Sequence, residues 1–237
     1  MRPRRVDPVA RERRGIELLR IMGHTRFVLI GGYAVSSYGL PRFSVDLDIV
    51  VRATDVEPIR ALLRKEGLDK DRDLRGVVPS TISFEAWSDG LIGVDLLIDE
   101  VVDRRSGAIF PIELVERGAS NRLVSGRGAS VNASVNVAAP ETLLMLKLCA
   151  GRLVDLRDVA ILSRLDLSPE KMKRLASAAP RDALLETTER LERALLTREF
   201  KDSLKGEFMM KERRFEECVA STRRMCETIR GIVSALP

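Results

Sequence analysis

The sequence predicts an α+β protein, in which a mixed α/β part is followed by an all-helical part. Three patterns support this fold class. Residues 27–51 read as strand, tight glycine turn, short helix and strand, and residues 130–137 alternate apolar and polar side chains as a strand does. Beyond Ser168 only helical patterns are found. We therefore expect two domains, residues 1–138 and residues 139–237.

The first predicted element is a helix that Asp7 caps and that starts at Pro8. It lies in an arginine-rich stretch, because residues 2–20 contain seven arginines and three acids. Two interpretations stay open for these arginines. They form the solvated face of a surface helix, or they contact a polyanionic substrate.

The strand that closes residues 27–51 carries two acidic residues. Asp46 and Asp48 stand in an otherwise apolar run that ends at Val51. A strand alternates its faces with period two, so both carboxylates point the same way. Neighbouring carboxylates with little hydration repel each other. A cation bound between them would remove this repulsion.

A helix and a loop are expected next. Thr54 and Glu57 have the spacing of a capping box, and Gly67 ends the helix that they start. Residues 68–80 are polar and predict a loop.

A β-hairpin then introduces a third strand-borne carboxylate. Two strand-like runs, Thr81–Trp87 and Leu91–Ile98, flank the turn residues 88–90. The second run is apolar except for Asp95. An unpaired charge is costly there, so Asp95 is either an acid at the edge of the core or a ligand.

The remaining elements are read from apolar spacing and helix-start signals. Residues 108–115 are a further strand candidate, and Pro140 starts a helix that carries Lys147 and continues into residues 148–162. Three more helices are expected, one starting at Ser168 and two over residues 184–196 and 214–232, with loops near Pro180 and Gly206.

Three aspartates on neighbouring strands suggest a magnesium or manganese site. Oxygen-only ligands suit Mg²⁺ or Mn²⁺, and two such ions about 3.5–4 Å apart form the clamp used for nucleotidyl transfer. The single histidine, His24, excludes a zinc site built from several histidines.

Four residues ahead of the aspartates are suited to bind phosphates. Gly31 and Gly32 lead into a helix N-terminus, where backbone N–H groups favour phosphate. Arg42 and Ser44 are close enough in sequence to contact the same phosphates. Taken singly, a double glycine is a tight turn and Asp-x-Asp is common in loops. The order of all these parts favours a metal and nucleotide site.

The composition narrows the choice of compartment and partner. The net charge is +5, from 40 basic and 35 acidic residues, and it permits an anionic partner such as nucleotide or RNA without proving one. The three cysteines lack metal-ligand spacing, and we find neither a signal peptide nor a membrane-spanning stretch. We expect a soluble, cytoplasmic protein with reduced thiols.

The pattern G-G-x-A-x(4)-G-x-x-R-x-S-x-D-x-D, from Gly31 to Asp48, resembles the signature of the DNA polymerase β-like nucleotidyltransferase superfamily. Asp95, in a Val-Asp-Leu strand, is similar to the family's third acid. Minimal prokaryotic nucleotidyltransferases are the closest likeness, including the abortive-infection toxins of toxin–antitoxin systems. Their downstream lysine and Arg-Asp motif is similar to Lys147 with Arg157-Asp158 here. The resemblance covers about residues 25–165.

This resemblance implies a mixed, twisted β-sheet flanked by helices, with the active site on one sheet face. Asp46 and Asp48 would bind both metal ions, and Asp95 would bind one ion and help to deprotonate the acceptor. The phosphates of the NTP would be held by Gly31, Gly32, Arg42, Ser44 and Lys147. Asp158 would orient the lysine or contact the acceptor.

We therefore expect a metal-dependent nucleotidyltransferase that moves an NMP from an NTP to a hydroxyl and releases pyrophosphate. The acceptor is a tRNA end or a protein side chain, and a cognate antitoxin or a second copy of the chain is a possible partner. The alternative is a non-catalytic relative that binds nucleotide or partner, like an antitoxin. The C-terminal helices, with interleaved charges and few aromatics, favour a packed bundle or dimer face over an RNA platform.

Overall fold

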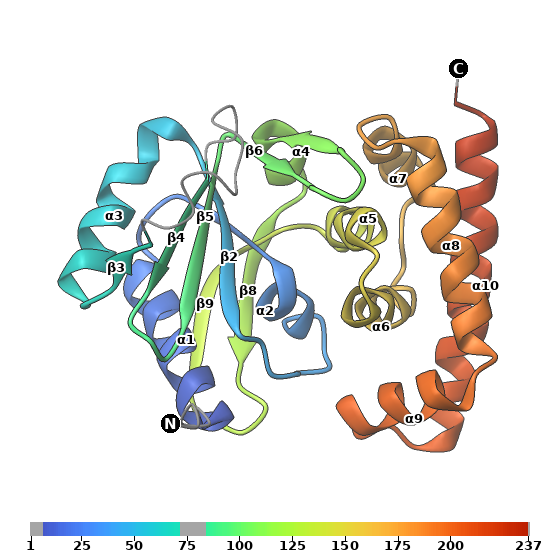
Figure 1. The fold of residues 1–237 in the computed structure, drawn as a ribbon, viewed down its shortest axis with the longest axis horizontal. Helices are drawn as coiled ribbons and strands as arrows, with labels where there is room; N and C mark the ends of the chain where they lie inside the picture. The colour runs from blue at the N-terminus through green and yellow to red at the C-terminus, as the bar shows by residue number, and fades with distance from the viewer. Residues whose placement is uncertain (1–6, 72–83, 237) are drawn as a thin grey trace. The chain divides into compact units, whose positions relative to one another are not determined.

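The computed structural model describes residues 7–71 and 84–236. It divides into two compact units, one made of Met1–Val101 with Pro111–Ala138 and the other of Val102–Phe110 with Ala139–Pro237. The mixed α+β fold that the sequence predicts is confirmed (Figure 1). Part of the predicted loop 68–80 and the first residues of the strand predicted from Thr81 lie outside the described residues.

The first unit is built on a seven-stranded sheet with the order β3-β4-β5-β2-β1-β9-β8. The sheet is mixed, because β2 pairs with β5 and β1 with β9 in parallel while the other neighbours pair antiparallel. Its strands are β1 Val28–Ile30, β2 Asp46–Val51, β3 Asp69–Lys70, β4 Phe84–Ser88, β5 Gly93–Ile98, β8 Ser120–Ser125 and β9 Asn132–Val137.

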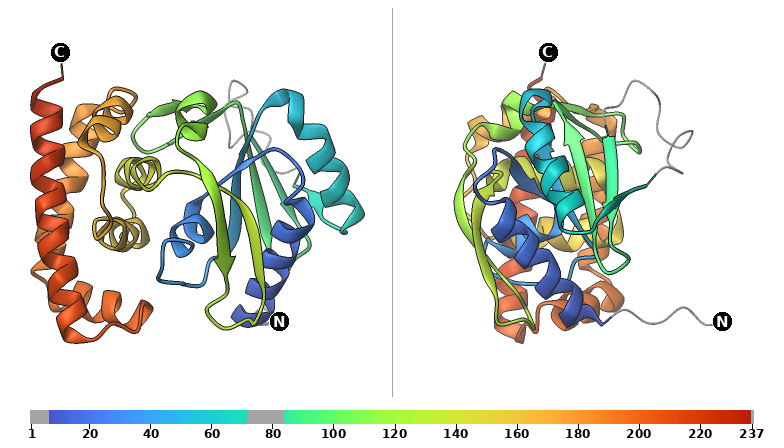
Figure 2. Two further views of the ribbon diagram at one scale, coloured as in Figure 1. Left: turned by 180° about the vertical axis from the view of Figure 1, so that it is seen from behind. Right: turned by 90° about the vertical axis from the view of Figure 1, so that its left-hand side faces the viewer.

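Helices cover this sheet because their apolar sides pack on its buried residues. The helices of the unit are α1 Pro8–Met22, α2 Gly31–Ser36, the 3₁₀ turn η1 Ala53–Asp55, α3 Val56–Lys65 and α4 Ile112–Glu116. Helix α1 packs on β9 and α3, whereas α2 packs on β2, β1 and β8 (Figures 1 and 2). Asp7 caps α1 as predicted, by accepting a hydrogen bond from Val9 N at 3.1 Å.

The two faces of the central strands differ in burial. On one face, Leu47, Ile49, Val94 and Leu96 are fully buried, as period-two alternation requires. Their sequence neighbours Asp46, Asp48, Gly93 and Asp95 are half-exposed on the opposite face. The strand pairing thus leaves one apolar face for the core and one open face that carries the carboxylates.

The second unit is a bundle of helices, α5 Pro140–Ala150, α6 Leu153–Leu162, α7 Pro169–Ala176, α8 Arg181–Leu195, α9 Arg198–Glu207 and α10 Glu212–Ser234. The predicted continuous helix after Pro140 is interrupted, because Gly151 adopts a left-handed conformation (φ 59°) and ends α5. The three cysteines lie in this core, and burial raises the pKa of the Cys149 thiol to about 12 and that of Cys218 to about 11.

Several predicted elements are wrong in detail. Of residues 108–115, only Ile109–Pro111 form a strand, β7, which pairs with β6 Glu100–Val102 in a two-stranded sheet. Helix α4 follows at once, because Ile112 and Val115 are buried at helical spacing.

The end signals of two helices also mislead. Helix α3 begins at Val56 after the 3₁₀ turn, so Thr54 and Glu57 form no capping box. Gly206 lies inside α9, which the sequence did not predict, rather than in a loop. Strand β8, Ser120–Ser125, was likewise missed, because its residues are mostly polar.

Candidate active site

The pairing of β2 with β5 brings the three predicted aspartates to one place. In the parallel register, Asp48 lies directly opposite Asp95, and Asp46 lies opposite Gly93. Directly opposite residues on neighbouring strands share a face. The open face of the sheet therefore carries three carboxylates on two adjacent strands.

The first glycine of the predicted phosphate turn lies against one of these carboxylates. Gly31 has φ +70°, and a Cβ built there would stand 1.9 Å from Asp48 Oδ2. Only glycine fits a left-handed backbone position at such close range. The β1–α2 connection therefore passes directly over Asp48.

The second glycine lies against the two polar residues that precede β2. A Cβ on Gly32 would stand 2.5 Å from Ser44 Oγ and 2.9 Å from Arg42 Nη2. Arg42 is only 7% exposed, and its Nη1 donates to Phe43 O at 3.0 Å. The structure thus groups Gly31, Gly32, Arg42 and Ser44 along the same edge of the open face.

Asp46 has a different environment. A Cβ on the opposite residue, Gly93, would stand 2.3 Å from Asp46 Oδ1, so the absence of a side chain there makes room for the carboxylate. Burial raises the pKa of Asp46, against the opposing charge of Arg11. Within the part of the chain that the structure describes, no lysine or arginine forms an ion pair with Asp46.

Arg11 of helix α1 acts on Asp46 through its charge, which sequence reasoning missed. Arg11 Nε donates to Leu91 O at 3.0 Å, which holds the guanidinium beside the start of β5. The buried hydroxyl of Tyr33 is close to Gly15 of α1, and burial raises its pKa. These contacts depend on how α1 packs against the sheet, which the periodicity of α1 does not reveal.

The arginines of α1 divide between internal contacts and a solvated face. Besides Arg11, Arg14 bonds internally, to Asp89 Oδ2 at 3.0 Å and to the backbone oxygen of Glu66 at 2.6 Å. Two arginines thus fix α1 to the β4–β5 turn and to the end of α3. The solvated-face interpretation holds for Arg13 and Arg20, which are exposed.

The other two predicted site residues belong to the helical unit. Lys147 Nζ lies 3.1 Å from Asp158 Oδ2 and 2.9 Å from Asp155 Oδ1. Both carboxylates are fully buried, and Arg152 Nε adds a further contact to Asp155 at 2.8 Å. Sequence reasoning missed Asp155, although its i, i+3 spacing to Asp158 places both on one helix face.

Charge compensation by neighbouring cations lowers the pKa of Asp155. Burial alone would raise the pKa of Asp155, but the charges and hydrogen bonds of Lys147 and Arg152 hold the pKa below its usual value. The cluster therefore contains two cations for its two carboxylates.

The donor set of the open face fits a divalent metal ion. Three carboxylates match the preference of Mg²⁺ and Mn²⁺ for oxygen ligands. Among residues 7–71 and 84–236, no group of three or more His, Cys, Asp or Glu side chains is arranged to hold a metal as the side chains stand. The fit therefore rests on the strand register and on the room left at Gly31 and Gly93, rather than on side-chain conformations.

This fold, with its sheet-borne carboxylates beside a double-glycine turn, is that of a nucleotidyltransferase. A family model described as the nucleotidyl transferase AbiEii toxin of type IV toxin–antitoxin systems matches residues 19–221. The chain belongs to this family. Nucleotidyltransferases of this kind generally use a divalent metal, and the family implies a cognate antitoxin and an NTP substrate.

Solved structures show similarity at low sequence identity. An ANT(2″)-Ia structure in complex with adenylyl-2″-tobramycin is 14% identical (TM-score 0.46), covering 70% of this chain and 92% of its own. The nucleotidyltransferase toxin MenT4 from Mycobacterium tuberculosis H37Rv is 17% identical (TM-score 0.42; 96% and 92%). A tRNA-processing enzyme in an apo form is 17% identical (TM-score 0.35; 100% and 60%).

A search of curated proteins finds no match. None of the helices in the described residues is long and apolar enough to cross a membrane.

Proposed function

We propose that this protein transfers an NMP from an NTP to a hydroxyl of an acceptor and releases pyrophosphate, with divalent metal ions as cofactors. The observation that carries the proposal is the register of β2 and β5, which sets Asp48 opposite Asp95 with Asp46 two residues along. A binding-only protein has no need for three carboxylates on one open face, where they repel each other.

Each carboxylate has a proposed role. Asp46, Asp48 and Asp95 would hold two Mg²⁺ or Mn²⁺ ions, and Asp95 would also receive the proton of the acceptor hydroxyl. When bound, the ions neutralise the triphosphate and the charge that develops during transfer. The acceptor oxygen forms a bond to the α-phosphorus, the bond from that phosphorus to the β-phosphate oxygen breaks, and pyrophosphate leaves.

The β1–α2 turn and the segment before β2 hold the phosphates in this proposal. Gly31 and Gly32 present backbone N–H groups without side chains that would block the approach. Arg42 supplies a buried guanidinium, and Ser44 supplies a hydroxyl beside it. The backbone N–H groups, the guanidinium and the hydroxyl together support binding of a polyanion next to the carboxylates.

Lys147 and Asp158 are proposed to assist phosphate binding. Lys147 binds phosphate and Asp158 orients the lysine, which the 3.1 Å ion pair between them supports. Asp155 joins Asp158 in this role, since it contacts the same ammonium group. Residues 1–138 are the proposed catalytic domain and residues 139–237 the proposed helical domain.

We propose RNA, in particular a tRNA end, as the acceptor ahead of a protein side chain. The net charge of +5 favours a polyanionic acceptor. A toxin that modifies RNA would be restrained by its cognate antitoxin, acting on the toxin or on its product.

The test is a transfer assay with the full-length protein. The protein is incubated with Mg²⁺ and each α-labelled NTP, together with total RNA or with lysate protein. Label is expected in the RNA fraction, and it is expected to be lost in Asp46→Asn/Asp48→Asn. The matched control is Asp69→Asn, an exposed carboxylate on edge strand β3 of the same sheet.

Label confined to the protein fraction would move the acceptor from RNA to a protein side chain. A folded protein that binds NTP but labels no fraction would replace the enzyme with the non-catalytic alternative.

A further inference from the structure

The helical unit contains an open pocket that the proposed chemistry does not use. It has a volume of about 350 Å³, within the size range of small-ligand sites. Residues of α6, α8 and α9 line it, together with the segment between α8 and α9. They are Leu153, Leu156, Arg190, Arg193, Ala194, Thr197, Glu199, Phe200 and Ser203.

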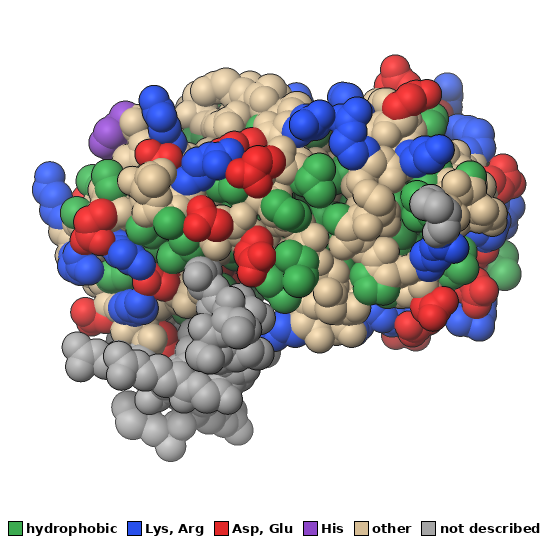
Figure 3. All heavy atoms as spheres, turned by 90° about the horizontal axis from the view of Figure 1, so that it is seen from above, with side chains coloured by type: hydrophobic (Ala, Val, Ile, Leu, Met, Phe, Trp, Pro, Cys, Tyr) green, Lys and Arg blue, Asp and Glu red, His purple; other side chains and the backbone are tan. Residues whose placement is uncertain are grey.

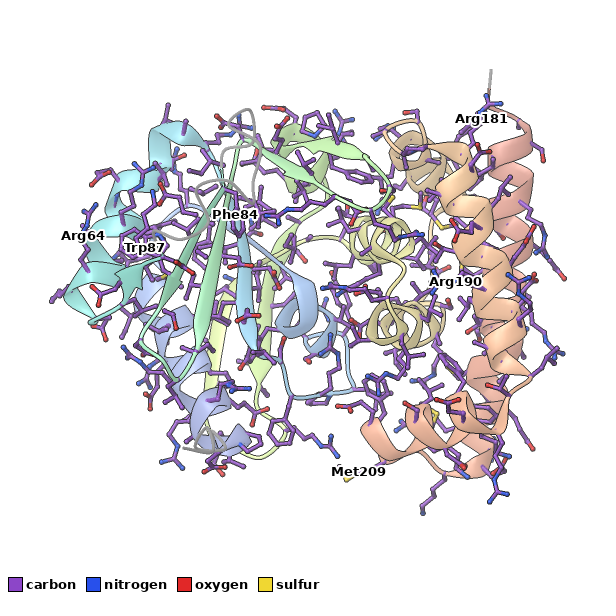
Figure 4. All side chains as sticks on the ribbon, viewed as in Figure 1. Arg64, Phe84, Trp87, Arg181, Arg190 and Met209 are labelled. Carbon is purple, nitrogen blue, oxygen red and sulfur yellow. The ribbon has the colours of Figure 1, made fainter. Side chains whose placement is uncertain are left out.

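Two arginines give this pocket its charge. Arg190 and Arg193 lie three residues apart on α8, so they project from neighbouring positions of one helix face (Figure 4 labels Arg190). Neither arginine forms an ion pair within the described residues. Two guanidinium groups therefore line one small cavity, and neither is ion-paired with Glu199, the one acid among the described residues that line it.

Several other basic residues of the same unit form ion pairs. Arg230 forms a two-pronged pair with Glu192 at 2.6 and 2.9 Å, and Lys201 and Lys205 both contact Glu212. Charges of both signs are also interspersed on the face shown in Figure 3. What distinguishes Arg190 and Arg193 is that both line the same cavity.

The remaining lining suits a phosphate ester better than a bare ion. Ser203 Oγ accepts a hydrogen bond from Arg157 Nη1 at 3.0 Å, which leaves its own hydrogen to be donated. Leu153 is 52% exposed, and the buried Leu156 and Phe200 extend the apolar lining. A ligand with an anionic head and an apolar or ring-shaped remainder matches this combination.

We propose that the pocket between α6, α8 and α9 binds a phosphate ester of a nucleotide, with Arg190 and Arg193 contacting the phosphate and Ser203 donating to it. Guanidinium groups bind phosphate oxygens in a two-pronged geometry that lysine cannot reproduce. The nucleotide belongs to an RNA chain or is free, and both sources share this chemistry. Glu199 also lines the pocket and opposes an anion.

The test measures binding by full-length protein with a fluorescent single-stranded RNA, and with AMP and inorganic phosphate as competitors. The variant Arg190→Gln/Arg193→Gln is compared with Arg223→Gln/Arg224→Gln, two exposed arginines of α10 that do not line the pocket. Both variants remove the same charge. The pocket variant is expected to bind at least about ten-fold more weakly, and the control to keep its affinity.

The salt dependence of binding and a variant expected to bind more tightly sharpen the test. Loss of the contacts to one phosphate is expected to reduce the magnitude of the slope of log K against log salt by about 0.7, because each phosphate neutralised in a single strand contributes about 0.7. Glu199→Gln is expected to tighten binding. Competition by AMP at the pocket identifies a free nucleotide as the ligand, and its absence identifies the RNA backbone.

The proposal would be overturned if both double variants lost affinity equally, or if the pocket variant kept its affinity. It would also be overturned if the wild-type protein bound none of the probes. The Asp48→Asn/Asp95→Asn protein is measured in parallel. It is expected to keep this binding while it loses transfer, so failure of the pocket and failure of the proposed function are distinguishable.

Discussion

Two groups of aspartates in this chain have opposite electrostatic environments. On the open face of the sheet, Asp46 lies beside Asp48 and Asp95 without an ion-pair partner of its own in the described residues, and burial raises its pKa. In the helical unit, Asp155 is fully buried, yet Lys147 and Arg152 lower its pKa.

The difference shows which carboxylate has its charge compensated by neighbouring side chains: Asp155 and not Asp46. Asp155 and Asp158 of α6 both form ion pairs with Lys147 of α5, and these pairs hold the two helices together. The sheet carboxylates lie side by side on two paired strands. Under the proposed function, a divalent ion would reduce the repulsion between them.

The largest expected effect is a loss of transfer activity when Asp95 is replaced. Asp95→Asn is expected to lower the rate of transfer on the order of 10³-fold, because metal-assisted charge stabilisation contributes several kcal/mol. The thermal midpoint should stay within a few degrees of wild type. Single-turnover transfer and thermal unfolding measure the two quantities on one preparation. Full activity in the variant would remove Asp95 from the site.

Asp155 is expected to respond in the opposite manner. Asp155→Asn leaves the buried Lys147 with part of its charge uncompensated, so the free energy of unfolding should fall by about 3–5 kcal/mol. Urea unfolding measures this, with Asp166→Asn as the control because Asp166 is exposed in the same unit. A loss no greater than that of the control would contradict the view that this cluster stabilises the fold.

Gly31 and Gly206 differ in the space around them: a side chain at Gly31 would collide with Asp48, whereas one at Gly206 would meet no atom within 4 Å. Gly31→Ala places a side chain at φ +70° against Asp48, so we expect a cost of about 1–2 kcal/mol from the backbone alone, together with loss of transfer. Gly206→Ala meets nothing within 4 Å and should stabilise α9 by about 0.5 kcal/mol. Urea midpoints of both variants measure these changes, and equal shifts would show that the Gly31 position is not special.

The pH dependence of stability separates the two groups by sign. The folded-state pKa of Asp155 lies below that of an unfolded Asp, about 3.9, so its contribution is present above about pH 4 and is lost as the pH falls through the folded-state value. The folded-state pKa of Asp46 is raised, so its contribution is largest below about pH 4 and is lost as the pH rises through the folded-state value.

Urea midpoints measured against pH in EDTA test these signs. Asp155→Asn should flatten the fall in stability on the acid side, and Asp46→Asn should flatten a smaller fall just above pH 4. Profiles that change in the same direction in both variants would show that the two environments do not differ as described.

The sequence was sufficient to predict which strand residues share a face, but it was insufficient to predict contacts between distant segments. Period-two alternation placed Asp46 and Asp48 on one face, and the hairpin placed Asp95 on a strand. The register that sets Asp48 of β2 opposite Asp95 of β5 could not be predicted, because the two strands are far apart in the chain.

Residues whose role depends on packing were also beyond sequence reasoning. Arg11 reaches the start of β5 only because α1 packs across the sheet. Asp155 meets Lys147 only because Gly151 turns the chain between α5 and α6. Gly206 shows the opposite error, since a glycine in a helix with no close neighbour was read as a loop.

Binding of Mn²⁺, followed by electron paramagnetic resonance, tests most directly whether the open-face carboxylates hold a cation that the rest of the protein does not. Wild-type protein and the Asp69→Asn and Asp166→Asn controls are expected to remove free Mn²⁺ from solution equally. Asp48→Asn/Asp95→Asn, folded as judged by circular dichroism, is expected to leave it free. Equal Mn²⁺ binding in that variant and in wild type would contradict the central claim.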